Sequence, residues 1–207
     1  MVSAVTVSVS QIEQVLANHR FRKKMLRPLL KRAAVAMILR EVNGDAHILM
    51  IKRAARQGDP WSGHMAFPGG VMEAEDRHGF DVACRETEEE IALRLMQSGR
   101  FIGRLSELMT HFQLRRRAMV VSPYVFVVDD EVVDDQVVDD EIACAPNAEV
   151  SELLWVPLAY LANSNNRERM KWRVGMLDIP LPCYRYQGRL IWGLSLMMLD
   201  ELLALLR

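Results

Sequence analysis

The sequence from Phe67 to Leu93, FPGGVMEAEDRHGFDVACRETEEEIAL, determines how the rest of the chain is interpreted. It opens with a Pro-Gly-Gly turn, continues through a short polar loop and ends in a segment with helical periodicity. One face of the predicted helix can pack against a sheet, and its residues are Phe80, Cys84, Thr87 and Ile91.

A second face of the same helix carries Glu86, Glu89 and Glu90, which stand at i, i+3 and i+4. Like charges at this spacing repel each other and destabilise a helix by about 0.2–0.5 kcal/mol per pair. A hard divalent cation removes that repulsion, and a ligand set made only of oxygen atoms suits magnesium or manganese better than zinc. We therefore expect a Mg²⁺ (or Mn²⁺) site on this face.

Gly70 and the run Arg85-Glu86-x-x-Glu89-Glu90 resemble the Nudix box, a glycine followed at fixed distance by R-E-x-x-E-E. The resemblance implies a loop-helix-loop that binds magnesium and hydrolyses a diphosphate joined to some other group. It implies that the three glutamates are metal ligands and catalytic groups, and that the Gly70 carbonyl is a further ligand. Arg85 would orient a carboxylate, which its i, i+4 relation to Glu89 allows.

Three positions depart from the usual box. Asp76 stands where the family has its first glutamate, and eight residues instead of seven then precede Arg85. The glycine that usually closes the box is Ala92. These departures affect the loop and the end of the helix, and they leave the three glutamates in place.

Within the Nudix family, the chain is most similar to the coenzyme A pyrophosphatase group. That group combines F-P-G-G, an aspartate six residues after the second glycine, a longer box loop and a final W-G…E-L helix, for which Trp192-Gly193 is the match. The upstream signature L-L-T-x-R-S matches less well, because the run from Leu49 to Ala54 lacks the threonine and the serine. In addition, Gly63 stands ten residues after Arg53, where the group has nine.

This resemblance implies hydrolysis of coenzyme A or an acyl-CoA to phosphopantetheine and adenosine 3′,5′-bisphosphate. Two alternatives stay open. The same metal site could serve another diphosphate substrate, namely ADP-ribose, a dinucleotide or a nucleoside triphosphate. The chain could also be a non-catalytic Nudix binding module, although such modules typically lose box carboxylates.

Several residues outside the box are candidates for the site. Arg53, at the end of a predicted strand, and Arg115 and Arg117 in a later turn offer cations to a phosphate-rich substrate. Glu149 is the first candidate for an additional catalytic carboxylate and Glu141 the second, because Nudix enzymes draw such a group from this region. His64 lies in a Gly- and Pro-rich loop, where a hydrogen-bonding role is more common than general base catalysis.

The composition excludes several classes of protein. Half of the 207 residues are apolar and the net charge is −1, which argues against disorder and against a nucleic-acid-binding surface. No apolar run reaches the ~20 residues that span a bilayer, so we expect no membrane partner. Three scattered cysteines with no secretory signal predict reduced thiols and a cytoplasmic location. The expected partner is a small-molecule diphosphate, and a homodimer is one assembly that the sequence allows.

The predicted fold is a Nudix-type α/β/α sandwich with a mixed β-sheet. Residues 33–39 and 46–51 read as strands joined at Asn43-Gly44, a strong hairpin signal. Residues 119–128 read as another strand, in which Pro123 predicts an edge or a bulge. Residues 1–30 read as an N-terminal helical extension, with a capping box from Ser10 to Glu13, and residues 31–207 as the hydrolase domain.

Overall fold

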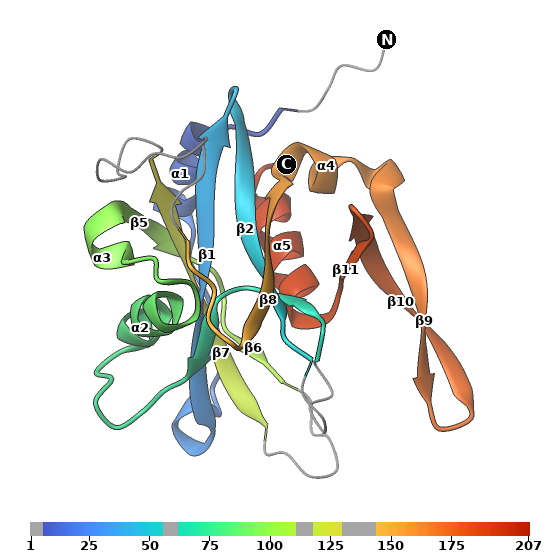
Figure 1. The fold of residues 1–207 in the computed structure, drawn as a ribbon, viewed down its shortest axis with the longest axis horizontal. Coiled ribbons are helices and arrows are strands. Elements are labelled where there is room, and N and C mark those ends of the chain that lie inside the picture. The colour runs from blue at the N-terminus through green and yellow to red at the C-terminus, as the bar shows by residue number, and fades with distance from the viewer. Residues whose placement is uncertain (1–5, 56–61, 111–117, 130–143) are drawn as a thin grey trace.

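A computed structural model describes residues 6–55, 62–110, 118–129 and 144–207 of the chain. Within these residues the structure contains a large mixed sheet with helices on both faces, and a small antiparallel sheet beside it (Figure 1). The predicted α/β class and the mixed sheet are therefore confirmed. No helix in the described ranges is both long and apolar enough to cross a bilayer.

The main sheet has the strand order β3-β2-β1-β7-β5, with β4 paired to β1, β6 to β7 and β8 to β2. The central pair β1 and β7 is parallel, and the other pairings are antiparallel. Its strands are β1 (Lys31–Val42), β2 (Asp45–Arg53), β3 (Met65–Ala66), β4 (Gly69–Val71), β5 (Gly99–Arg104), β6 (Leu108–Met109), β7 (Met119–Val128) and β8 (Val150–Pro157).

The first two strands form the predicted hairpin. Asn43 and Gly44 both have positive φ, 51° and 81°, which a type I′ turn needs. The antiparallel pairing then extends from the pair Val42–Asp45 to the pair Leu39–Ile48. The local turn chemistry thus sets the register of β1 against β2.

Helices cover both faces of the main sheet, with α2 and α3 on one side and α1 and α5 on the other (Figure 1). The helical segments are α1 (Val9–Asn18), α2 (Gly79–Ile91), α3 (Leu95–Ser98), α4 (Leu158–Ala162), α5 (Gly193–Leu205) and the 3₁₀ turns η1 (Arg27–Leu29) and η2 (Ser164–Asn166).

Strand β1 is buried on both faces, because its alternating side chains belong to two separate cores. Met37 and Leu39 pack into the core on the side of α1 and α5. Ala36 and Ile38 pack into the core on the side of α2 and α3. This explains why the strand reads as a continuous apolar run instead of an alternating one.

The N-terminal helix starts two residues earlier than the sequence predicted. Ser8, not Ser10, is the N-cap of α1, and its partner in the capping box is Gln11. This register turns Ile12 and Leu16 into the core, where both are buried. The helix therefore packs on the main sheet.

Pro123 does not mark an edge strand, so that part of the prediction is wrong. It lies inside β7, which pairs with β1 along its whole length on one side. On the other side, β5 pairs from Tyr124 onward and β6 pairs at Val120 and Val121. The proline stands at the gap between these two neighbours, where no ladder hydrogen bond from its nitrogen is needed.

The C-terminal residues form a second, three-stranded sheet in the order β11-β10-β9. Its strands are β9 (Arg167–Val174), β10 (Leu177–Tyr186) and β11 (Arg189–Ile191). Strand β10 runs through both Pro180 and Pro182. The two prolines are two residues apart, so their nitrogens face the same edge of β10. Strand β11 pairs with β10 only at residues 184–186, so it needs no hydrogen bond from either proline.

Helix α2 ends at Ala92, which has a left-handed backbone conformation with φ 59°. Glycine is the usual residue at such a position, because a Cβ atom crowds the following carbonyl oxygen. The departure from the usual Nudix box at this position therefore costs the helix end some strain.

We expect Ala92→Gly to raise the free energy of unfolding by about 1 kcal/mol, since it removes this strain. Chemical denaturation with an unchanged m-value would measure the gain. The matched control is Ala145→Gly, at an exposed loop position with φ below zero. That variant has the same added chain entropy when unfolded and should lose stability. Equal effects of the two substitutions would contradict the strain at Ala92.

Candidate metal and catalytic site

The site lies where β4 pairs with β1, next to helix α2. Gly69 has φ 154°, and a Cβ atom there would overlap the backbone of Ala34 and Val35. A Cβ atom on Gly70 would overlap the carboxylate of Glu86. Two consecutive glycines are therefore needed, one for the approach to the sheet and one for the approach to the helix.

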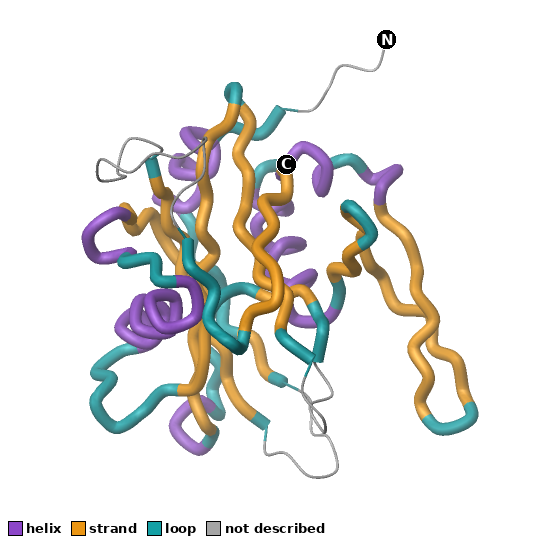
Figure 2. Tube along the Cα trace, viewed as in Figure 1, coloured by secondary structure: helices purple, strands orange, loops and turns teal. Residues whose placement is uncertain are grey.

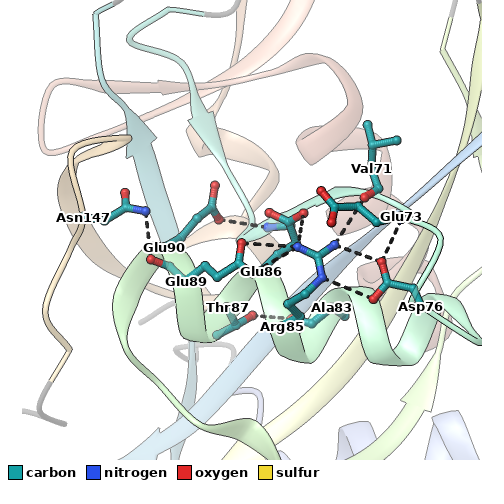
Figure 3. Close-up of polar contacts among 11 residues, drawn as sticks. Val71, Glu73, Asp76, Ala83, Arg85, Glu86, Thr87, Glu89, Glu90 and Asn147 are labelled. Atoms are coloured by element: carbon teal, nitrogen blue, oxygen red, sulfur yellow. Dashed lines mark hydrogen bonds and ion pairs between the residues drawn. The ribbon is translucent and has the colours of Figure 1, made fainter.

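Glu90 is the most buried carboxylate of the site, with 4% of its surface exposed. Its Oε2 accepts a hydrogen bond from the Gly69 N–H at 3.0 Å, which joins the helix to the glycine turn (Figure 3). Burial raises the pKa of Glu90 from 4.5 to about 7, and the nearby carboxylates of Glu86 and Glu149 add to the rise. The Gly69 hydrogen bond and Arg53 act in the opposite direction.

Glu86 lies one turn earlier on the same face and is half-buried against Gly70. Burial is also the main cause that raises its pKa, and the carboxylates of Glu89 and Glu73 contribute to the rise. Only Arg85 opposes these effects on Glu86. The raised pKa values of these two neighbouring carboxyl groups show that burial disfavours the charged form of both.

Arg85 connects three carboxylates around the start of the site (Figure 3). Its Nε and Nη2 donate to the two oxygens of Asp76 at 3.2 and 3.0 Å. Its Nη1 lies 3.0 Å from Glu86 and 3.2 Å from Glu89. The Arg85 guanidinium, above all through its hydrogen bonds, holds the pKa of Asp76 below its usual range.

The Asp76 contact explains one departure from the usual box. Asp76 also accepts a backbone hydrogen bond from Glu73, which closes the loop before α2. Aspartate is shorter than the glutamate that the family usually has here. The guanidinium group of Arg85 still binds both oxygens of Asp76 in a bidentate contact. The loop is thus tied to the arginine that organises the carboxylates.

A loop far away in the sequence donates hydrogen bonds to the last carbonyl groups of α2. The Asn147 side chain donates to the carbonyl of Glu89, and its backbone N–H donates to that of Glu90, both at 2.8 Å. Ala145 donates to Ile91, and Ala92 donates to Glu88. The last four carbonyls of the helix therefore all have partners. The sequence reading missed Asn147, although Pro-Asn is a recognisable turn signal.

The carboxylates fit a hard cation only in part as they stand. Glu86 and Glu90 offer oxygen donors beside the glycine turn. Glu89 instead pairs with Arg85, and its side chain is 56% exposed. Accordingly, no ready-made group of three His, Cys, Asp or Glu ligands is found among the described residues. Glu89 would have to turn from Arg85 toward Glu86 to complete the set.

The other predicted residues have different outcomes. Arg53, at the end of β2, and Glu149, in the loop before β8, both act electrostatically on Glu90, so the fold brings them near the site. The ring of His64 packs edge-on against Trp192 at 5.0 Å between centroids. Arg115, Arg117 and Glu141 lie outside the described residues.

The family model of the NUDIX domain matches residues 30–173 of this chain. An uncharacterised protein of Schizosaccharomyces pombe is 36% identical over 84 residues, which is 40% of this chain and 26% of that protein. The human mitochondrial coenzyme A diphosphatase NUDT8 is 28% identical over 176 residues, 84% of this chain and 69% of the human protein.

Among solved structures, a MutT/nudix family protein from Enterococcus faecalis has the same fold. The TM-score is 0.55 at 14% identity, and the match covers 94% of this chain and 68% of the other. The likeness extends beyond the matched domain into the C-terminal residues of the chain.

The raised pKa of Glu90 predicts a pH-dependent loss of stability in metal-free protein. The folded state favours protonated Glu90, so this stability is present below pH 4.5 and is lost as the pH rises through about 7. The loss should amount to no more than about 3 kcal/mol. Urea unfolding in the presence of a chelator, from pH 4 to pH 8, would measure it.

The substitution Glu90→Gln should flatten this pH dependence. Glu88→Gln is the matched control, because Glu88 is an exposed carboxylate of the same helix that pairs with Arg94. A Glu90→Gln profile that still falls like that of the wild type would refute the assignment of the loss to Glu90.

Proposed function

Because this chain belongs to the Nudix family, we propose that it hydrolyses a phosphoanhydride bond in a nucleoside-diphosphate derivative, with Mg²⁺ or Mn²⁺ as the cofactor. The observation that carries this proposal is the pair of glutamates, Glu86 and Glu90, held against the Gly69-Gly70 turn. A regulatory or binding module would have no use for the buried Glu90 carboxylate set beside the half-buried Glu86.

The residues that would hold the metal are Glu86, Glu90, the Gly70 carbonyl and Glu89 once it leaves Arg85. All are hard oxygen donors, as magnesium and manganese prefer. When bound there, the metal would supply Lewis-acid chemistry, namely a lower pKa for a water molecule and neutralisation of charge on the phosphate groups.

The chain's own residues would position the reactants. Arg85 holds Asp76 through two hydrogen bonds, so it would keep the loop before α2 in register with the helix after Glu89 has left it. Glu149 follows the turn that caps α2 and acts on Glu90, which supports it as the additional carboxylate that accepts a proton from water. Arg53 pairs with the strand that follows Glu149 and also acts on Glu90, and it is our candidate cation for a substrate phosphate.

For the substrate, we favour coenzyme A or an acyl-CoA, with phosphopantetheine and adenosine 3′,5′-bisphosphate as products. Support comes from the F-P-G-G turn, from Asp76 and from the Trp192-Gly193 start of α5. A human relative that aligns over 84% of this chain bears the name coenzyme A diphosphatase. ADP-ribose, a dinucleotide or a nucleoside triphosphate is the alternative substrate.

Three further expectations belong to this proposal. They are a cytoplasmic location, the capacity to form a homodimer, and the division into an N-terminal extension (1–30) and a hydrolase domain (31–207). Subcellular fractionation, sedimentation analysis and expression of residues 31–207 alone would test them in turn.

We expect Glu89→Gln and Glu90→Gln each to lower kcat by two orders of magnitude or more, because each removes an anionic metal ligand. The fold should survive, and metal-free stability should hold or rise, since carboxylate repulsion is relieved. Steady-state assays across a magnesium titration would measure the effect. Glu88→Gln, on the same helix but off the site, should keep its activity. Near wild-type turnover of either site variant at saturating magnesium would remove that residue from the ligand set.

The substrate can be tested by comparing coenzyme A with its dephospho form, which lacks the 3′-phosphate. A charge-assisted contact contributes about 1.5–3 kcal/mol, so kcat/KM should be roughly tenfold or more higher for coenzyme A. Arg53→Ala, Arg115→Ala or Arg117→Ala should erase this ratio, whatever each does to the absolute rate. Equal rates in the wild type would reject the 3′-phosphate argument. Faster hydrolysis of ADP-ribose would establish the alternative substrate.

A further inference from the structure

Two segments expose large apolar side chains to an unusual degree. Met176 and Met25 are each 95% exposed, Leu29 is 82% exposed and Leu177 is 72% exposed. These are the four most exposed large apolar side chains among the described residues. They lie close to one another in only two segments, which distinguishes them from scattered surface residues.

The first segment is the hairpin of β9 and β10, which projects from the body of the protein (Figure 1). A tight turn at Gly175, with φ 61°, places Met176 and Leu177 at its tip. Behind the tip, exposed cations occupy alternate positions of β9 and so share one face; they are Arg169, Lys171 and Arg173. In the part of the chain that the structure describes, none of the three forms an ion pair.

The second segment runs from Arg20 to Arg32 and contains Met25 and Leu29. It holds seven of the chain's 26 Lys and Arg residues and no Asp or Glu, although the whole chain has a net charge of −1. Six of these cations are exposed: Arg20, Arg22, Lys23, Lys24, Lys31 and Arg32. The seventh, Arg27, turns inward and pairs with the buried carboxylate of Glu107 at 3.3 Å.

Glu107 fixes the backbone of this second segment. Its side chain accepts a hydrogen bond from the Lys24 N–H at 2.8 Å, and its own N–H donates to the Arg22 carbonyl at 2.9 Å. Ser106 accepts the N–H of Arg22. With the backbone and Arg27 bound inward, the remaining cations and both apolar side chains are directed to the surface.

The two segments lie at the same end of the molecule. In the view of Figure 1, the turn of the β9–β10 hairpin and the η1 turn both reach the lower edge of the structure. Figure 2 shows the two turns at opposite sides of that lower edge, with the main sheet between them. In this view both turns therefore face the same side of the molecule.

We infer that this end of the protein binds the surface of an anionic lipid bilayer. Met25, Leu29, Met176 and Leu177 enter the headgroup region, and the surrounding cations pair with lipid phosphates and carboxylates. Binding of this kind scales with buried apolar area and with attraction to anionic lipid. Contact with a membrane surface needs no spanning helix, and this inference departs from the expectation of no membrane partner.

Two other occupants fit these observations less well. Single-stranded nucleic acid is bound by basic grooves with aromatic side chains that stack on bases, whereas the most exposed apolar groups here are aliphatic. A second copy of the chain, docked through the same end, would bring two clusters of like charge together, because a twofold interface uses the same patch twice.

The test uses the full-length protein and two kinds of vesicle, phosphatidylcholine alone and phosphatidylcholine mixed with phosphatidylserine. We expect co-sedimentation with the mixed vesicles only, and release at high salt. Met176→Ser with Leu177→Ser should weaken binding about tenfold or more. Lys23→Gln with Lys31→Gln should weaken it roughly fivefold for each cation lost.

Met96→Ser is the matched control, since Met96 is a 70% exposed methionine on α3, away from both segments. It should bind vesicles like the wild type, and all variants should keep wild-type hydrolysis, because none alters the catalytic site. The inference is overturned if the mixed vesicles do not bind, if the tip and cation variants bind as well as the control, or if neutral vesicles bind equally. It is also overturned if a single-stranded RNA oligonucleotide displaces the vesicles, or if the tip variants only dissociate a dimer.

Discussion

The contact between the Gly69-Gly70 turn and the carboxylates of α2 constrains the rest of this structure. The backbone of the turn must approach the sheet on one side and Glu86 on the other, with no room for a Cβ atom at either glycine. Glu90 then reaches back to the Gly69 N–H. The helix cannot move away from the sheet without breaking this bond, so the apolar packing of α2 and the geometry of its charged face are set together.

The charged face is stable in this form because each carboxylate has a different environment. Glu90 is buried and hydrogen-bonded to backbone, Glu86 is wedged against glycine, and Glu89 is held by an arginine. Arg85 thus serves as the local cation while it also secures the loop through Asp76. A site that relied on three equivalent carboxylates would repel itself at neutral pH.

Much of this arrangement could be predicted from local sequence. The spacing of the glutamates places them on one face, and Asn43-Gly44 specifies its hairpin, because both depend on backbone geometry over a few residues. The pairing of Arg85 with Glu89 is also local, because the two residues stand at i and i+4 of one helix. The cap from Asn147 and the position of Pro123 between two strands could not be predicted, because each depends on segments that meet only in the folded chain.

The parallel pairing of β1 with β7 also has a consequence for how the protein folds. These strands form the centre of the sheet, yet β2, the glycine turn and α2 all lie between them in the chain. Closing so long a loop costs entropy before any ladder contact is gained, and sheets of this kind form slowly. Helix α2 packs on that ladder, so the candidate site is not assembled in the nascent chain until these two distant strands have met.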